Sequence, residues 1–212
     1  MGEVIRKSAA AADIFADVRT TLQATAARGG ELQTQAQDML GPIDALAKSL
    51  TDRLRAAEAA VEAPRQNVLA LDEQADALLV SFYEECWNLA GRSAYDPLLA
   101  ILFPGGAAAW TDGPTAEQPS RMTLLADLLE AHLHPAIPAI RADEMAAEVR
   151  AAAATLRAAV TEAADRQTAA TVLLRTRTAL ASAAAVQLAR LKRLWLATVS
   201  YTHLTLPTNR EV

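Results

Sequence analysis

Cysteine, histidine and aromatic residues are scarce in this chain of 212 residues. The one cysteine, Cys86, excludes an intrachain disulfide and a cysteine-rich zinc site. Phenylalanine, tryptophan and tyrosine together make up 4 % of the residues, so bulky aromatic packing contributes little to any core. None of the three histidines stands three residues after a glutamate, whereas a di-metal carboxylate bundle needs two Glu-x-x-His pairs. No cofactor is predicted.

A long uninterrupted apolar segment is also missing. The most apolar stretch, residues 97–110, is cut by Pro104, Gly105 and Gly106, and a membrane span needs about 20 apolar residues in a row. The first residues include charges such as Glu3 and Arg6, where a secretory signal would be apolar. We therefore expect a soluble cytoplasmic protein with membrane insertion disfavoured.

Excess positive charge is absent as well. The formal net charge is −5 and the isoelectric point is near 5.3. A general nucleic-acid binder needs a basic surface for the phosphates, so nucleic acid is not an expected partner.

Alanine is what the sequence has instead: 50 of the 212 residues. Alanine is the strongest helix former and loses no side-chain entropy on folding. It also buries little surface, so stability must come from many small contacts along long helices. The composition predicts an all-α protein.

Apolar spacing and helix breakers divide the chain into expected helices. The first covers residues 4–40, with Gly29-Gly30 as a weak point, because each glycine costs about 1 kcal/mol relative to alanine; two helices divided at these glycines are the alternative. The second covers residues 42–90, starting at Gly41-Pro42. Its apolar residues alternate in steps of three and four, and this phase continues across Pro64. We therefore predict one kinked helix; two helices broken at Ala63-Pro64 are the alternative.

Residues 91–138 form a connector rich in helix breakers. Asp96-Pro97 indicates a helix over 96–103 with Asp96 as its cap, and Ser120 indicates a second over 121–133. After Pro138 no glycine or proline occurs until Pro207, which predicts one helix over 139–198. The polar residues 165–168 allow an antiparallel hairpin instead.

Such long helices need partners for their apolar seams. The expected architecture is a long-helix bundle, antiparallel and coiled-coil-like, forming a single domain over residues 1–198 with the connector capping one end. Long helices around a Pro-Gly-Gly connector are similar to helical domains of several bacterial proteins, but no motif here identifies a family.

The tail differs from the rest of the chain. Residues 199–212, VSYTHLTLPTNREV, contain no alanine and interrupt the helical period. This stretch resembles a peptide that arises when sequencing-adapter DNA is translated in frame. We expect an artefactual or disordered tail; a genuine terminus ending in a short strand is the alternative.

Few groups of polar residues suggest a catalytic or metal-binding site. Asp127, Glu130 and His134 share one face of an expected helix and are a weak candidate for a metal site. The alternative interpretation is a solvated helix end without a metal ion. Cys86 has no histidine nearby to activate it and lies on the apolar face, so we expect a buried, inert thiol. Asp72 and Asp76 are expected to face solvent.

Aromatic residues concentrate between positions 82 and 110. They define a candidate apolar pocket, although such a group is more often core: Phe82, Tyr83, Trp87, Tyr95, Phe103 and Trp110.

Basic residues concentrate near the end of the last expected helix: Arg175, Arg177, Arg190, Lys192 and Arg193. They suit an acidic partner or lipid headgroups. Their spacing, however, places them on several faces of the expected helix, which favours a solvated surface.

The function predicted from these patterns is structural: an interaction protein whose helical seams bind itself or another protein. A ligand-binding bundle that uses the aromatic group at residues 82–110 is the alternative. No catalytic site is predicted, so an enzyme is not expected.

Overall fold

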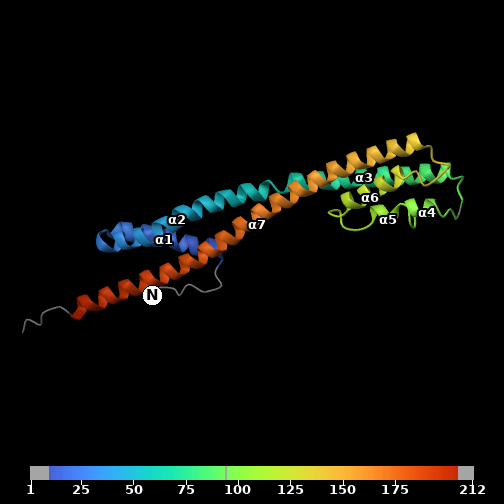
Figure 1. Cartoon of the computed structure of the whole chain (residues 1–212). Helices are drawn as coiled ribbons and strands as arrows, with labels where there is room; N and C mark the ends of the chain where they lie inside the picture. Colours follow the sequence, from blue (N-terminus) through green and yellow to red (C-terminus); the bar gives the residue numbers. More distant parts are fainter. Residues whose placement is uncertain (1–9, 94, 205–212) are drawn as a thin grey trace, which may run out of the picture. The chain divides into compact units, whose positions relative to one another are not determined.

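The computed structural model describes residues 10–93 and 95–204, with side chains described as far as residue 197. This part of the chain folds into seven helices and contains no strand (Figure 1). The all-α prediction is confirmed, with long helices packed together.

The first break lies at the glycines and not at the proline. Helix α1 is Ala11–Arg28 and helix α2 is Gly30–Ala59. Gly29 and Gly30 have φ values of 70° and 68°, in the left-handed region that favours glycine. The predicted helices 4–40 and 42–90 are therefore wrong in their boundary, because α2 continues through Gly41 and Pro42.

Burial on both sides of Pro42 explains this continuity. Leu40 is fully buried and Ala47 nearly so, both in the core that α2 forms with α1 and α7. A proline inside a helix costs about 3 kcal/mol, and the burial of one leucine contributes about 1.5–3 kcal/mol. Unwinding the chain at Pro42 would remove these contacts.

The second break lies at Ala60 and Val61. Helix α3 is Glu62–Leu89, and Val61 keeps helical backbone angles (φ −81°, ψ −37°). Helices α2 and α3 are thus joined across a two-residue turn, in keeping with the kinked helix predicted over 42–90. Pro64 has no N–H to donate to the Ala60 carbonyl, and helical bonding resumes with the Arg65 N–H donating to the Val61 carbonyl at 3.3 Å. The break thus precedes Pro64 by one turn.

The connector contains three short helices: α4 (Leu99–Leu102), α5 (Ala108–Thr111) and α6 (Gln118–Glu130). Asp96 caps the start of α4 as predicted, since its Oδ1 accepts the N–H groups of Leu98 and Leu99 at 2.9 and 3.0 Å. Helix α5 was not predicted, and α6 begins three residues before the expected position 121.

Helix α7, Ala139–Leu204, is one continuous helix. The hairpin alternative at residues 165–168 is wrong. The helix also continues through residues 199–204, so the interruption expected at Val199 does not occur there. Residues 205–212 lie outside the described part of the chain.

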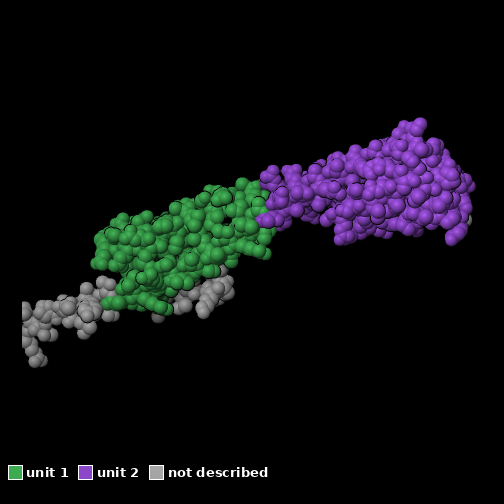
Figure 2. Space-filling model, in the orientation of Figure 1, with its two compact units in different colours: residues 1–58, 169–212 green, residues 59–168 purple. Residues whose placement is uncertain are grey.

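The chain divides into two compact units (Figure 2). Unit 1 comprises Met1–Glu58 and Ala169–Val212, and unit 2 comprises Ala59–Thr168. In unit 1 the core joins α1, α2 and α7. Its buried residues are Ile14, Phe15, Val18, Ala36, Leu40, Ala47, Ala181, Ala184, Leu188 and Leu191.

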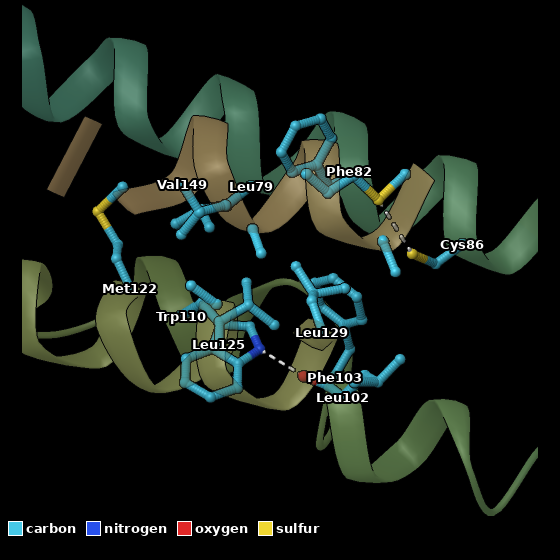
Figure 3. Close-up of a cluster of buried hydrophobic side chains, with 14 of the residues drawn as sticks. Leu79, Phe82, Cys86, Leu102, Phe103, Trp110, Met122, Leu125, Leu129 and Val149 are labelled. Carbon is cyan, nitrogen blue, oxygen red and sulfur yellow. Dashed lines mark hydrogen bonds between the residues drawn. The ribbon is translucent and has the colours of Figure 1, made fainter. Parts of the chain in front are cut away.

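Unit 2 packs α3 and the first part of α7 against the connector helices (Figure 3). Leu79 and Cys86 from α3, Leu125 and Leu129 from α6 and Val149 from α7 meet in its core. These side chains are at most 1 % exposed. The connector is therefore part of the core of unit 2.

No helix within the described residues is long and apolar enough to cross a membrane.

Candidate interaction surface

Helix α7 has two different sides in unit 1. One side contributes Ala181, Ala184, Leu188 and Leu191 to the core. The other carries apolar and small residues that are exposed. Val172 is 54 % exposed and Val186 is 66 % exposed, and Ala179 and Ala183 lie between them.

These four residues form one row. Because a helix advances about 100° per residue, Val172, Ala179, Ala183 and Val186 fall within an arc of about 60°. The two alanines would let another helix approach closely, and the two valines would provide apolar contact at either end. A row spaced by seven, four and three residues is the pattern that a second helix recognises.

Three arginines lie on the same side: Arg175, Arg190 and Arg193. They fall within about 60° of Val172 on the helical projection. The five basic residues therefore occupy more than one face, as expected from the sequence. Arg177 lies elsewhere, against the ring of Phe15 at 5.7 Å.

The three arginines are exposed, and none forms an ion pair with another residue of the described chain. Between positions 169 and 204, α7 contains five basic residues and no acidic one. We call this surface the basic face of α7. It consists of Val172, Arg175, Ala179, Ala183, Val186, Arg190 and Arg193.

The predicted metal ligands do not come together. Asp127 and Glu130 both form ion pairs with Arg150 from α7. His134 binds Asp96 instead, through Nε2 and Oδ2 at 3.0 Å. Within the described residues no group of three or more histidine, cysteine or acidic side chains is placed to hold a metal ion.

His134 has a structural role. Its side chain is 5 % exposed, and its Nδ1 accepts the Ala136 N–H at 3.2 Å. The Nε2 nitrogen therefore carries the proton that it donates to Asp96. The backbone N–H of Leu99 and the bond from His134 lower the pKa of Asp96. The pair ties the α6–α7 linker to the start of α4.

Cys86 is enclosed in the core of unit 2. Burial raises the pKa of its thiol to about 12, and its Sγ lies 3.9 Å from Sδ of Met145. The neighbouring carboxylate of Glu85 is held by Arg141 at 2.7 and 2.9 Å. This arrangement supports the expectation of an inert thiol.

The six residues of the candidate apolar pocket are not one cluster. Phe82, Phe103 and Trp110 are at most 5 % exposed and belong to the core of unit 2, and the Trp110 Nε1–H donates to the Leu102 carbonyl at 2.9 Å. Tyr83 packs edge-on against Phe103. Trp87 is half-buried, and Tyr95 is 84 % exposed. Protein atoms pack around the buried rings, so no observation here favours a ligand site.

Two acidic residues face protein where the sequence suggested solvent. Asp72 accepts a hydrogen bond from Thr115, and Asp76 accepts one from Gln118 at 2.6 Å. Burial raises the pKa of Asp76, and the bond from Gln118, itself 1 % exposed, opposes that shift. The connector covers this side of α3, which helical spacing alone does not reveal.

Comparison with known protein families, with curated proteins and with solved structures finds no match.

Proposed function

We propose that this protein is a structural interaction protein that binds another polypeptide helix through the basic face of α7. One observation carries the proposal. An ordered helix presents Val172 and Val186, both more than half exposed, in one row with arginines that form no ion pair with any residue the structure describes. Apolar rows of this kind are buried when two helices pair.

The chemistry of the face selects an acidic, amphipathic partner helix. Apolar residues of the partner would pack on the valines and alanines, and its flanking carboxylates would meet the arginines. The proposal includes no catalytic step.

A fluorescent synthetic peptide tests the proposal. The probe is an amphipathic helix with leucine at the heptad seam positions and glutamate beside the seam, and the control probe carries lysine in place of glutamate. We expect the anisotropy of the acidic probe to rise with added protein in a saturable manner. The lysine probe should bind at least about tenfold more weakly, because its charges repel the arginines.

A matched pair of variants locates the site. Val186→Glu places a carboxylate in the centre of the face, whereas Leu174→Glu alters an exposed apolar residue, 47 % exposed, outside the face. Binding should be lost in the first variant and kept in the second. If neither probe binds, or if the two variants bind alike, the proposal is wrong.

A further inference from the structure

Helix α3 carries a surface that complements the basic face. Glu62, Glu73 and Glu84 recur every eleven residues, and all three are exposed. Leu69 is 47 % exposed and Val80 is 40 % exposed, and both lie between these glutamates. The five residues fall within about 60° on the helical projection. We call them the acidic face of α3.

Few of these charges are neutralised nearby. Arg65 is the only basic residue in α3, which contains six acidic residues. Glu62 accepts a hydrogen bond from Gln66, which is neutral. Glu73 and Glu84 form no ion pair with a residue in the described part of the chain.

The two units carry opposite net charge. Residues 59–168 include 16 acidic and 7 basic residues, whereas the rest of the chain includes 9 acidic and 13 basic residues. Such a division favours contact between unlike units of two molecules and disfavours contact between like units.

We propose that the basic face of α7 binds the acidic face of α3 in a second copy of this chain. The inference rests on the proposed function and names its partner. The two rows have similar lengths, about 33 Å from Glu62 to Glu84 and about 27 Å from Arg175 to Arg193, at 1.5 Å per residue. Each combines two exposed branched apolar residues with three like charges, of opposite sign in the two faces.

The acidic face is not the side of α3 that packs in the core of unit 2. The buried side of α3, with Leu79 and Cys86, lies against Met145 and Val149 of α7. The acidic face is exposed, so a second copy can supply the basic face that complements it. The opposite net charges of the two units favour this pairing between molecules.

Charge reversal with rescue tests this pairing in the full chain. One variant carries Arg175→Glu, Arg190→Glu and Arg193→Glu, and the other carries Glu62→Lys, Glu73→Lys and Glu84→Lys. Sedimentation velocity over a concentration series measures the association of each, at low salt and at about 0.5 M salt. A variant with Arg28→Glu, Arg53→Glu and Arg55→Glu makes the same charge change at exposed sites outside the face.

We expect the unaltered chain and the control variant to associate, and salt to weaken the association because it screens the charges. Each charge-reversed variant alone should associate at least about tenfold more weakly. An equimolar mixture of the two should associate again, since each then offers the other a complementary face. Circular dichroism confirms that the helices of each variant are formed.

An unaltered chain that stays monomeric at low salt, or a mixture that does not associate, would overturn the self-pairing. The peptide experiment distinguishes this from failure of the proposed function. If the chain is monomeric but still binds the acidic probe through the basic face, the proposed function stands and only the identity of the partner is wrong. If both experiments fail, the proposed function and the self-pairing are both wrong.

Discussion

Replacing Pro42 with alanine tests how α2 is built. Pro42 is the thirteenth residue of α2, so the helix there lacks the bond from residue 42 to the Asp38 carbonyl. Alanine restores this N–H and removes the steric conflict with the preceding turn, which together amount to about 3 kcal/mol. Proline also restricts the unfolded chain, and losing that restriction offsets about 0.4–1 kcal/mol. The expected net gain in the free energy of unfolding is about 2 kcal/mol.

Urea denaturation followed by circular dichroism at 222 nm measures this gain, and heating gives a second reading of about 4–8 °C. Pro64→Ala is the matched comparison. Pro64 lies in the first turn of α3, where N–H groups have no partner within the helix, so we expect a change of less than about 1 kcal/mol. The reasoning is refuted if Pro42→Ala is neutral or destabilising, as it would be for a proline that starts a helix at Gly41-Pro42.

Three further predictions concern unit 2. Leu125 is fully buried and the adjacent Leu124 is 53 % exposed. In urea unfolding, Leu125→Ala should therefore lower the free energy of unfolding by about 2–5 kcal/mol and Leu124→Ala by less than about 1 kcal/mol. Equal losses would mean that α6 does not pack as described. The Cys86 thiol, with its pKa raised to about 12, should resist alkylation at pH 8 until the protein is denatured; rapid labelling of the folded protein would contradict its burial. Arg141 lowers the pKa of Glu85 from its ordinary value of 4.5, so Glu85 stabilises the fold above that pH and loses this effect as the pH falls through the lowered value. Glu85→Gln should therefore be less stable than the parent at pH 7, and the difference should shrink as the pH falls below 4.5; a difference that does not change with pH would point to another cause.

Local pattern predicted the helices well and their ends poorly. The alternating apolar steps of residues 43–89 correspond to buried positions such as Leu50, Leu54 and Leu79, so the seam could be read from the sequence. The position of the break between α2 and α3 could not be read from the sequence. A proline at position 42 and one at position 64 look alike in the sequence, and only the burial around Leu40 makes the first tolerable inside a helix.

The connector shows a different limit of sequence reasoning. Asp96 could be predicted as a cap, because its acceptor and the following proline are local signals. Its contact with His134, 38 residues away, has no local signal. Similarly, Asp127 and Glu130 were placed on one face correctly, but Arg150, which takes both carboxylates, comes from another helix. Local spacing establishes faces, and tertiary packing decides what those faces meet.

The basic face was missed for a related reason. Five basic residues near the end of α7 were interpreted as one group distributed over several faces. The structure separates them, because Arg177 lies against Phe15 while Arg175 and Arg190 remain on the exposed side. A helical projection of the exposed residues alone would have found the row, but exposure is not known before the fold.

The middle of α7 tests how far alanine alone maintains a helix. Residues 164–169 are all exposed, yet the helix is continuous through them. If intrinsic propensity maintains it, Ala164→Gly with Ala169→Gly should cost about 2 kcal/mol, near the sum of two independent helix penalties. Ala153→Gly, at a residue only 2 % exposed, should exceed its single penalty of about 1 kcal/mol, because a buried methyl group is lost as well. Hydrogen exchange at the amides of residues 164–172 gives the local reading, and it should accelerate in the double variant only. Unchanged exchange there would mean that packing, and not alanine, keeps α7 in one piece.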